Sequence, residues 1–251
     1  MFYLDRDKLQ GKTALSAGAQ DAGAWQALFA SRAAGARHPA LRRYYQAGVV
    51  APETPIGQAP LVALDFETTG LDPHRHGIVS IGLVPMDSRR IYCAQGREWL
   101  VKPRKLLTAD SVTLHGITHS QIEDAPDLLL ILDDLLAQLQ GRIVVAHHGA
   151  IERDFLSAAL LARIGEEIVL PLIDTMQLEA RLQQQSLGWW DRLRGRKPAS
   201  IRLAQSRARY RLPHYRPHHA LTDALACAEL LQAQITHHFS PDTPVARLWH
   251  P

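Results

Sequence analysis

The first residues that could carry chemistry are two acids, one residue apart, in the run D-F-E-T-T-G at positions 65–70. Side chains alternate between the faces of a strand, so Asp65 and Glu67 point to the same face. Neighbouring carboxylates repel each other unless a cation lies between them, and their oxygens are the ligands that Mg²⁺ and Mn²⁺ prefer. Such a pair can hold two ions for phosphoryl chemistry. We expect Thr68, Thr69 and Gly70 to form a turn whose backbone N–H groups approach a phosphate.

The D-x-E-T-T-G element resembles the first motif of the DEDDh exonucleases, also called DnaQ-like. This family includes the proofreading epsilon subunit of bacterial DNA polymerase III, oligoribonuclease and ribonuclease T. The resemblance implies that Asp65 and Glu67 ligate both metal ions of a 3′-to-5′ exonuclease. Together with two further motifs in the same order, it covers residues 61–235.

The third motif is H-H-A-L-T-D-A at positions 218–224, which resembles the family pattern H-x-A-x-x-D-A. The resemblance implies that Asp223, at the start of a helix, completes the acidic cluster. It also implies that His218 is the general base that deprotonates water, a role suited to an imidazole because it titrates near neutral pH. The adjacent His219 is the alternative base. An isolated motif of this kind is often only a helix start, so the prediction depends on the other two motifs.

The second motif departs from the family pattern N-A-x-F-D-x-x-F-L, because this chain reads H-G-A-I-E-R-D-F-L at positions 148–156. In a gapless alignment Glu152 takes the place of the aspartate, and His148 takes the place of the asparagine. A glutamate can bind the same metal through a longer arm. Asp154 is the alternative ligand, but on a helix it lies about 200° round from Glu152.

Two further elements resemble the family. The run L-H-G-I-T at positions 114–118 resembles a stretch near the terminal nucleotide, which implies that His115 contacts the substrate. Without the family, Gly116 ends one helix and Thr118 caps the next. Asp174, before a predicted helix, is interpreted as an N-cap or as a support for the metal ligands.

The elements that must position these residues follow from the hydrophobic pattern. Prolines mark a linker near residue 58, and three strand-like runs joined by short turns favour antiparallel pairing. Two later strands flank a helix and are expected to be parallel. The strands are expected at 61–67, 78–85, 91–101, 142–147 and 168–173, and the helices at 127–139, 151–164, 175–182, 200–209 and 220–235. The pattern therefore predicts an α/β domain with a mixed five-stranded sheet flanked by helices, and the resemblance implies that this domain is ribonuclease H-like.

The domain organisation is expected to have three parts. Residues 1–58 form a helical N-terminal extension and linker, residues 59–240 the exonuclease domain with a basic insertion at 183–199, and residues 241–251 a C-terminal tail. The composition, 46% hydrophobic and 21% charged, excludes disorder and a membrane protein. No apolar run approaches the roughly 20 residues that span a bilayer, and the first residues lack a signal-peptide pattern, so we expect a cytoplasmic protein.

Charge and cysteine content bound the partners. The net charge is +3, but nine of the 28 Lys and Arg residues and one acid fall between Trp189 and Arg216. With Tyr210 and Tyr215, this basic segment would either follow phosphates and stack a base or remain a solvated loop. Two cysteines, Cys93 and Cys227, are too few for a disulfide framework or a zinc site, and both are expected in the core.

The sequence thus predicts a metal-dependent 3′-to-5′ exonuclease acting on DNA or RNA, with a single-stranded 3′ end as the substrate. Two Mg²⁺ or Mn²⁺ ions would be held by Asp65, Glu67, Glu152 and Asp223, and the product would be a nucleoside 5′-monophosphate. A DNA polymerase or a second copy of the chain is a possible partner. The alternatives are a non-catalytic nucleic-acid binding module, disabled at Glu152, and a polymerase-associated accessory subunit.

Overall fold

The computed structural model describes residues 22–104, 116–186 and 199–249. Its centre is a five-stranded sheet in the order β3-β2-β1-β4-β5. β2 is antiparallel to both β1 and β3, whereas β4 is parallel to β1 and β5 is parallel to β4. The strands are β1 Leu61–Thr68, β2 Ile78–Met86, β3 Arg97–Leu100, β4 Ile143–Ala146 and β5 Leu172–Asp174. The predicted α/β, ribonuclease H-like mixed sheet is confirmed.

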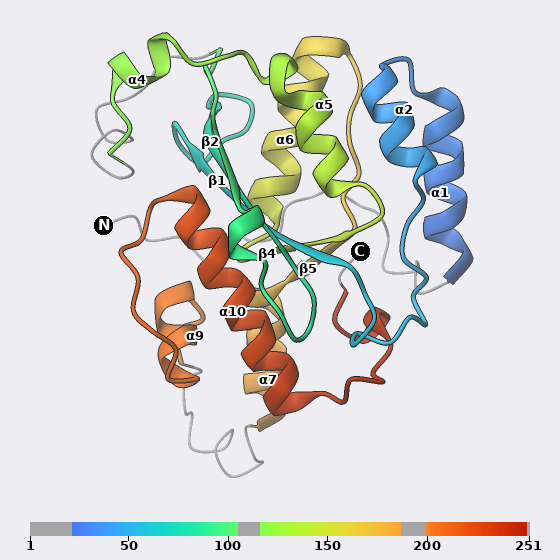
Figure 1. The fold of residues 1–251 in the computed structure, drawn as a ribbon, viewed down its shortest axis with the longest axis vertical. Coiled ribbons are helices and arrows are strands. Elements are labelled where there is room, and N and C mark those ends of the chain that lie inside the picture. The colour runs from blue at the N-terminus through green and yellow to red at the C-terminus, as the bar shows by residue number, and fades with distance from the viewer. Residues whose placement is uncertain (1–21, 105–115, 187–198, 250–251) are drawn as a thin grey trace.

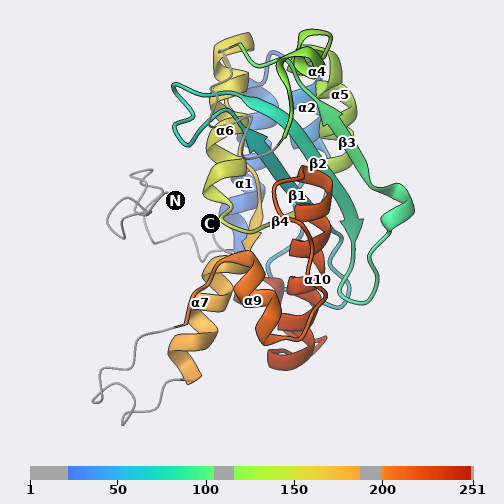
Figure 2. The same ribbon diagram turned by 90° about the vertical axis from the view of Figure 1, so that its left-hand side faces the viewer.

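The helices lie around this sheet (Figure 1). They are α1 Ala22–Gly35, α2 Pro39–Gln46, α4 His119–Glu123, α5 Leu128–Leu139, α6 Ala150–Ile164, α7 Thr175–Ser186, α9 Leu203–Arg209 and α10 Ala220–His238. Two short 3-10 turns are η2 Cys93–Gln95 and η3 Val245–Arg247. α10 packs across β1 and β2, and α7 lies beside α9, as Figure 2 shows from the side.

Two strands are shorter than the sequence predicts. The run 91–101 begins with a bridge from Ile91 to Met86, but the η2 turn interrupts it, and regular pairing starts at Arg97. The run 168–173 pairs only from Leu172, because Pro171 has no N–H to donate to a neighbouring strand. Cys227 is buried as expected, but Cys93 lies in the exposed η2 turn, so its predicted place in the core is wrong.

Residues from both ends of the described chain pack together beside the sheet. Trp25 of α1 stacks on Trp249, with ring centroids 5.1 Å apart, and Phe29 packs against Tyr44 and Tyr45 of α2. The hydroxyl of Tyr44 donates to the carbonyl of Val169, 3.0 Å away, just before β5. The two N-terminal helices are therefore part of one hydrophobic core with the sheet.

None of the helices in the described ranges combines the length and the apolar character needed to cross a bilayer.

Candidate active site

β1 carries the first two carboxylates to the centre of the sheet. Asp65 lies opposite Gly82 of β2 and Glu67 opposite Ser80, so both acids project from the same face, while Phe66 is buried on the other. Burial raises the pKa of Glu67 to about 8, and the charges of Asp223 and Glu98 add to the rise. Burial also raises the pKa of Asp65 well above its usual value.

A glycine on β2 lets the N-terminus of α10 approach these acids. A β-carbon at residue 82 would overlap the backbone of Ala220 and Leu221, so only glycine leaves room for the helix against the sheet. This contact places Asp223, in the first turn of α10, beside Glu67. One ligand atom each from Glu67, His218 and Asp223 lie within 4.8 Å of one another. Burial raises the pKa of Asp223, although the N–H groups and charges of His218 and His219 oppose the rise.

Glu152 brings the fourth carboxylate from the first turn of α6. Its side chain is buried, with 2% of the residue exposed, and burial raises its pKa to about 8. The backbone N–H groups of Glu152 and Phe66 lie close enough to oppose that rise. Its Oε2 atom is buried and has no hydrogen-bond partner among the residues that the structure describes. An unpaired buried carboxylate oxygen facing other acids is suited to a cation.

The surroundings of Asp65 include the other three acids. After burial, the causes that raise the pKa of Asp65 are the carboxylates of Glu152, Asp223 and Glu67, in that order. Asp154, the alternative in the second motif, is directed elsewhere. Its side chain is 41% exposed and its Oδ1 lies 3.4 Å from Nε of Arg153. The structure therefore brings Glu67, Asp223 and His218 together, with Asp65 on the same strand face and Glu152 near enough to act on Asp65, while the side chain of Asp154 is 41% exposed.

The position of Glu152 depends on Asp174, at the end of β5. One oxygen of this buried carboxylate accepts the backbone N–H groups of Met176 and Gln177 at 2.9 and 3.2 Å, and so caps α7 as the sequence predicts. The carboxylate also accepts the N–H groups of His148 and Gly149 at 3.2 and 3.0 Å, directly before α6. Asp174 therefore joins the N-termini of two helices.

His148 stands where the family has asparagine, and its backbone is in the left-handed region, with φ of 81°. Asparagine and histidine adopt that region more readily than most residues. The departure from the family pattern is therefore compatible with the turn that leads into α6.

His218 and His219 point to different partners. His218 is exposed and left-handed, with φ of 69°, and its backbone N–H donates to Oδ2 of Asp223 at 2.7 Å. This bond holds the residue beside the acidic cluster. Nε2 of His219 lies 3.6 Å from Oε2 of Glu98 on β3, outside the cluster. The geometry therefore favours His218 over His219 as the group next to the carboxylates.

The turn after β1 is held by its own hydrogen bonds. The hydroxyl of Thr68 donates to the carbonyl of Gly70 at 2.7 Å, and the hydroxyl of Thr69 accepts the N–H of Gly77 at 3.0 Å. Gly70 has no room for a side chain because the ring of His76 lies against it. These contacts fix the shape of the turn beside Glu67. His115, the other predicted substrate contact, lies outside the described residues.

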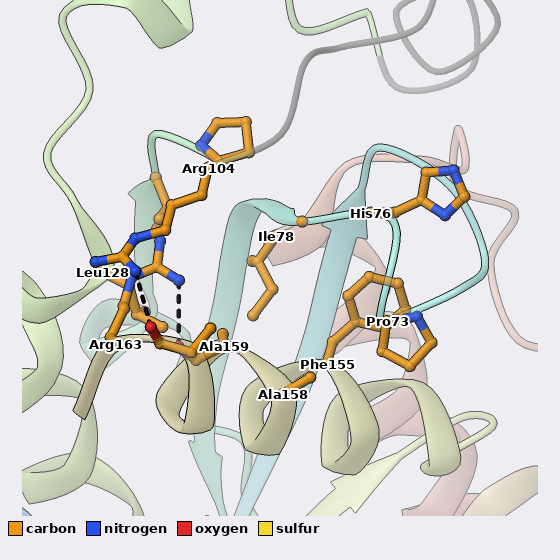
Figure 3. Close-up of a pocket in the computed structure, with 13 residues that line it drawn as sticks. Pro73, His76, Ile78, Arg104, Leu128, Phe155, Ala158, Ala159 and Arg163 are labelled. Atoms are coloured by element: carbon orange, nitrogen blue, oxygen red, sulfur yellow. Dashed lines mark hydrogen bonds between the residues drawn. The ribbon is translucent and has the colours of Figure 1, made fainter. Parts of the chain in front are cut away.

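A small pocket lies on the flank of α6 (Figure 3). Its volume is about 60 Å³, far below the roughly 300 Å³ of typical ligand pockets. Two arginines lie at one end, but both serve the fold: Nη1 of Arg104 donates to the carbonyl of Ala162 at 2.9 Å, and Nε of Arg163 pairs with Asp127 at 3.0 Å. The pocket therefore does not compete with the carboxylate cluster as the functional site.

Two supporting residues, Gly82 and Glu98, were not predicted from the sequence to contribute to the site. Gly82 is a lone glycine in a strand, a signal of close backbone approach. Glu98 accepts the hydroxyl of Ser80 at 3.0 Å and raises the pKa of Glu67. The basic segment was interpreted either as a surface that follows phosphates or as a solvated loop. Two of its arginines do neither, because Arg207 pairs with Glu229 and Arg209 with Glu179. Trp189 and Trp190 of that segment lie outside the described residues.

Comparison with known proteins shows the family to which the chain is related. The family model RNase T, described as exonuclease, matches residues 62–231. The PolC-type DNA polymerase III of Thermotoga maritima is 30% identical over 178 residues, which are 71% of this chain but 12% of that polymerase. The DNA polymerase III subunit epsilon of Treponema pallidum is 27% identical over 176 residues, 70% of this chain and 76% of that subunit.

Solved structures share the fold. Exonuclease X, in complex with 5′-overhanging duplex DNA, superposes with a TM-score of 0.56 at 23% identity, covering 75% of this chain and 98% of that one. The nuclease domain of 3′hExo, a DEDDh family member bound to rAMP, gives a TM-score of 0.57 at 16% identity, covering 71% and 92%.

Proposed function

The chain belongs to the RNase T exonuclease family, and we propose that it removes nucleotides one at a time from the 3′ end of a nucleic-acid strand. The observation that supports the proposal is the grouping of Glu67, Asp223 and His218, whose ligand atoms lie within 4.8 Å of one another, beside Asp65, whose pKa is raised by burial and by the charges of Glu152, Asp223 and Glu67. Capping or packing alone does not account for four acids at one place, because their mutual repulsion opposes folding.

The donor set fits a pair of hard divalent cations. Each group offers carboxylate oxygen, which suits Mg²⁺ or Mn²⁺ and not a softer ion. With their pKa raised to about 8, Glu67 and Glu152 need a nearby positive charge to be ionised at neutral pH. We propose that Asp65, Glu67, Glu152 and Asp223 hold two such ions, which would activate water and stabilise charge on the phosphate and the departing 3′ oxygen.

His218 takes the proton in this proposal. Its imidazole ring is exposed, so a proton that it accepts from water can pass on to solvent. The bond from its backbone to Asp223 keeps the ring beside the acidic cluster through each turnover. The water oxygen then bonds to the terminal phosphorus and the bond from phosphorus to the preceding 3′ oxygen breaks. The 3′ oxygen takes a proton from solvent to become the new 3′ hydroxyl, and a nucleoside 5′-monophosphate leaves.

The substrate is proposed to be the 3′ end of a DNA or RNA strand, presented single-stranded. Two relatives are named as DNA polymerase III components, and a polymerase is the class of partner we propose. The exposed His218 beside the half-buried Asp223 gives the end of a polymer access to one side of the acids.

The test uses single-stranded DNA and RNA labelled at the 5′ end, with Mg²⁺ or Mn²⁺ and with EDTA. We expect a ladder that shortens from the 3′ end, and ¹⁸O from labelled water in the 5′-monophosphate product. Asp65→Asn should abolish the ladder, while Asp154→Asn serves as a surface control. If folded wild-type protein with metal releases no mononucleotides, the proposed function is wrong.

A further inference from the structure

The segment between α9 and α10, residues 211–219, carries His218 and is called here the His218 loop. Two of its residues have left-handed backbones, Arg211 with φ of 57° and His218 with φ of 69°. Residues other than glycine are strained in the left-handed region and persist there only when their surroundings hold them. The contacts that hold this loop are therefore important for where His218 lies.

Apolar packing does not fully support the loop. A cavity of about 80 Å³ lies between α9, the loop and α10, and its lining includes Leu203, Pro213, Tyr215 and Asp223. The cavity thus extends from α9 to one of the four acids. The pocket is open to solvent, so the loop is not packed against α9 and α10 along its whole length, and polar contacts join these elements across it.

Arg207 of α9 supplies those polar contacts. Its side chain is 4% exposed, and Nη2 donates to the carbonyl of Pro213 in the loop at 2.8 Å and to Oε2 of Glu229 on α10 at 2.6 Å. Nη1 donates to the carbonyl of Ala226, also on α10. One planar guanidinium therefore joins α9, the loop and α10.

Tyr215 closes the same arrangement from the loop side. The guanidinium of Arg207 lies 4.7 Å from the centre of the Tyr215 ring, and the Tyr215 hydroxyl donates to Oε1 of Glu229 at 2.9 Å. The two oxygens of Glu229 are thus shared between Arg207 and Tyr215. Such planar, bidentate contacts suit arginine and are not reproduced by lysine.

We propose that Arg207, with Glu229 and Tyr215, is a brace that positions His218 for the reaction. Arg207 is a positioning residue, because it acts through the loop. None of its hydrogen bonds or ion pairs among the described residues involves Asp65, Glu67, Glu152 or Asp223. This inference rests on the proposed function for its catalytic consequence, but the brace itself is a statement about the loop. It also assigns a structural role to Arg207. From the sequence alone, this arginine of the basic segment was a candidate for binding phosphate.

The matched variants are Arg207→Lys and Arg209→Lys. Both lie on α9 and both keep the charge, but Arg209 pairs with Glu179 of α7 and makes no contact with the loop in its ion pair or hydrogen bonds. Lysine is preferred to alanine because removing a buried cation from Glu229 would strongly destabilise the fold. Tyr215→Phe keeps the ring and removes one hydrogen bond, so we expect the same change at a smaller size.

The first measurement is amide hydrogen exchange, which does not depend on activity. In Arg207→Lys we expect peptides that cover 211–219 to exchange about tenfold faster or more, with peptides from β1 and α6 unchanged. Arg209→Lys should leave the loop as in wild type. If the loop exchanges at the wild-type rate in Arg207→Lys, the brace does not exist.

The second measurement is a double-mutant cycle with His218→Ala. In the wild-type background we expect Arg207→Lys to lower kcat about ten- to a hundredfold, with KM changed less than about threefold. In the His218→Ala background it should cost almost nothing, because the group that it positions is gone. An equal loss in both backgrounds would overturn the positioning role. Failure of the proposed function would appear separately, as an inactive wild-type enzyme.

Discussion

Gly82 of β2 lies opposite Asp65 in the sheet, and the backbone of Ala220 occupies the space that a side chain at residue 82 would need. We predict that Gly82→Ala displaces the first turn of α10 and with it Asp223. Overpacking of this kind costs about 1–3 kcal/mol of stability, and a displacement of about 1 Å can lower turnover about a hundredfold. Thermal unfolding and steady-state kinetics check both effects.

The control for this prediction is Gly35→Ala at the end of α1, where an added β-carbon meets nothing within 4 Å. It should be neutral or slightly stabilising. If Gly82→Ala keeps the wild-type kcat and melting temperature, the contact between Gly82 and the N-terminus of α10 does not control the position of Asp223.

Glu152 and Asp154 give a second prediction, because the helix separates a buried acid from an exposed one. Glu152→Gln should lower kcat about a hundredfold or more and weaken Mn²⁺ binding measured by calorimetry, since it removes a charge from the cluster. Asp154→Asn should change neither quantity by more than about twofold. The reverse result would assign the second-motif ligand to Asp154.

His218 and His219 give a third prediction. His218→Gln should lower kcat by about 10²–10⁴, as expected for loss of a general base. His219→Gln should have an effect several times smaller, because its ring faces Glu98 and not the acidic cluster. Single-turnover rates with a short oligonucleotide measure the chemical step directly, and equal losses in both variants would refute the assignment.

Metal binding gives a fourth prediction. The four acids repel one another without cations, so Mg²⁺ should stabilise the folded chain. At about 100 times the dissociation constant the gain is about 2.7 kcal/mol, or roughly 5–10 °C in melting temperature. Differential scanning fluorimetry with EDTA and with Mg²⁺ measures the shift. Asp65→Asn should raise the melting temperature in EDTA and reduce the response to Mg²⁺, whereas an undiminished response would place the ions elsewhere.

The fifth prediction concerns acid stability. Burial lowers the pKa of His147 to about 4, with the nearby charge of Asp174 opposing the shift, and Nδ1 lies 2.9 Å from the hydroxyl of Thr175. The unfolded chain binds this proton near pH 6.5 and the folded chain only near pH 4. The neutral His147 therefore costs no stability above about pH 6.5. As the pH falls from 6.5 towards 4, the unfolded chain takes up the proton before the folded chain does, so the free energy of unfolding decreases.

His147→Gln should reduce the loss of unfolding free energy between pH 6.5 and 4, measured by urea titration. The control is His74→Gln in an exposed turn, which should keep the wild-type slope. An unchanged slope in His147→Gln would mean that other groups dominate this window.

The sheet and the four acids were predictable because their signals are local. Asp65 and Glu67 share a face by strand alternation, and Glu152 and Asp223 each stand in the first turn of a helix. Asp174 could be read as a cap for the same reason.

The supporting contacts were not predictable because they join positions far apart in the chain. Gly82 acquires its role only when α10 returns to β2, and Asp174 supports Glu152 through the N–H groups of His148 and Gly149. Arg207 has the same residue type as a phosphate contact, and only burial beside Glu229 distinguishes the two roles. Sequence spacing does not record such partners.

The packing of Trp25 on Trp249 has a consequence for the order of events during synthesis. α1 leaves the ribosome early, whereas its aromatic partner is added almost at the end of the described chain. Until then the Trp25 ring lacks its partner, and the hydrophobic cluster between α1, α2 and η3 stays incomplete. The nascent protein is therefore expected to expose an aromatic surface to chaperones until Trp249 has been translated.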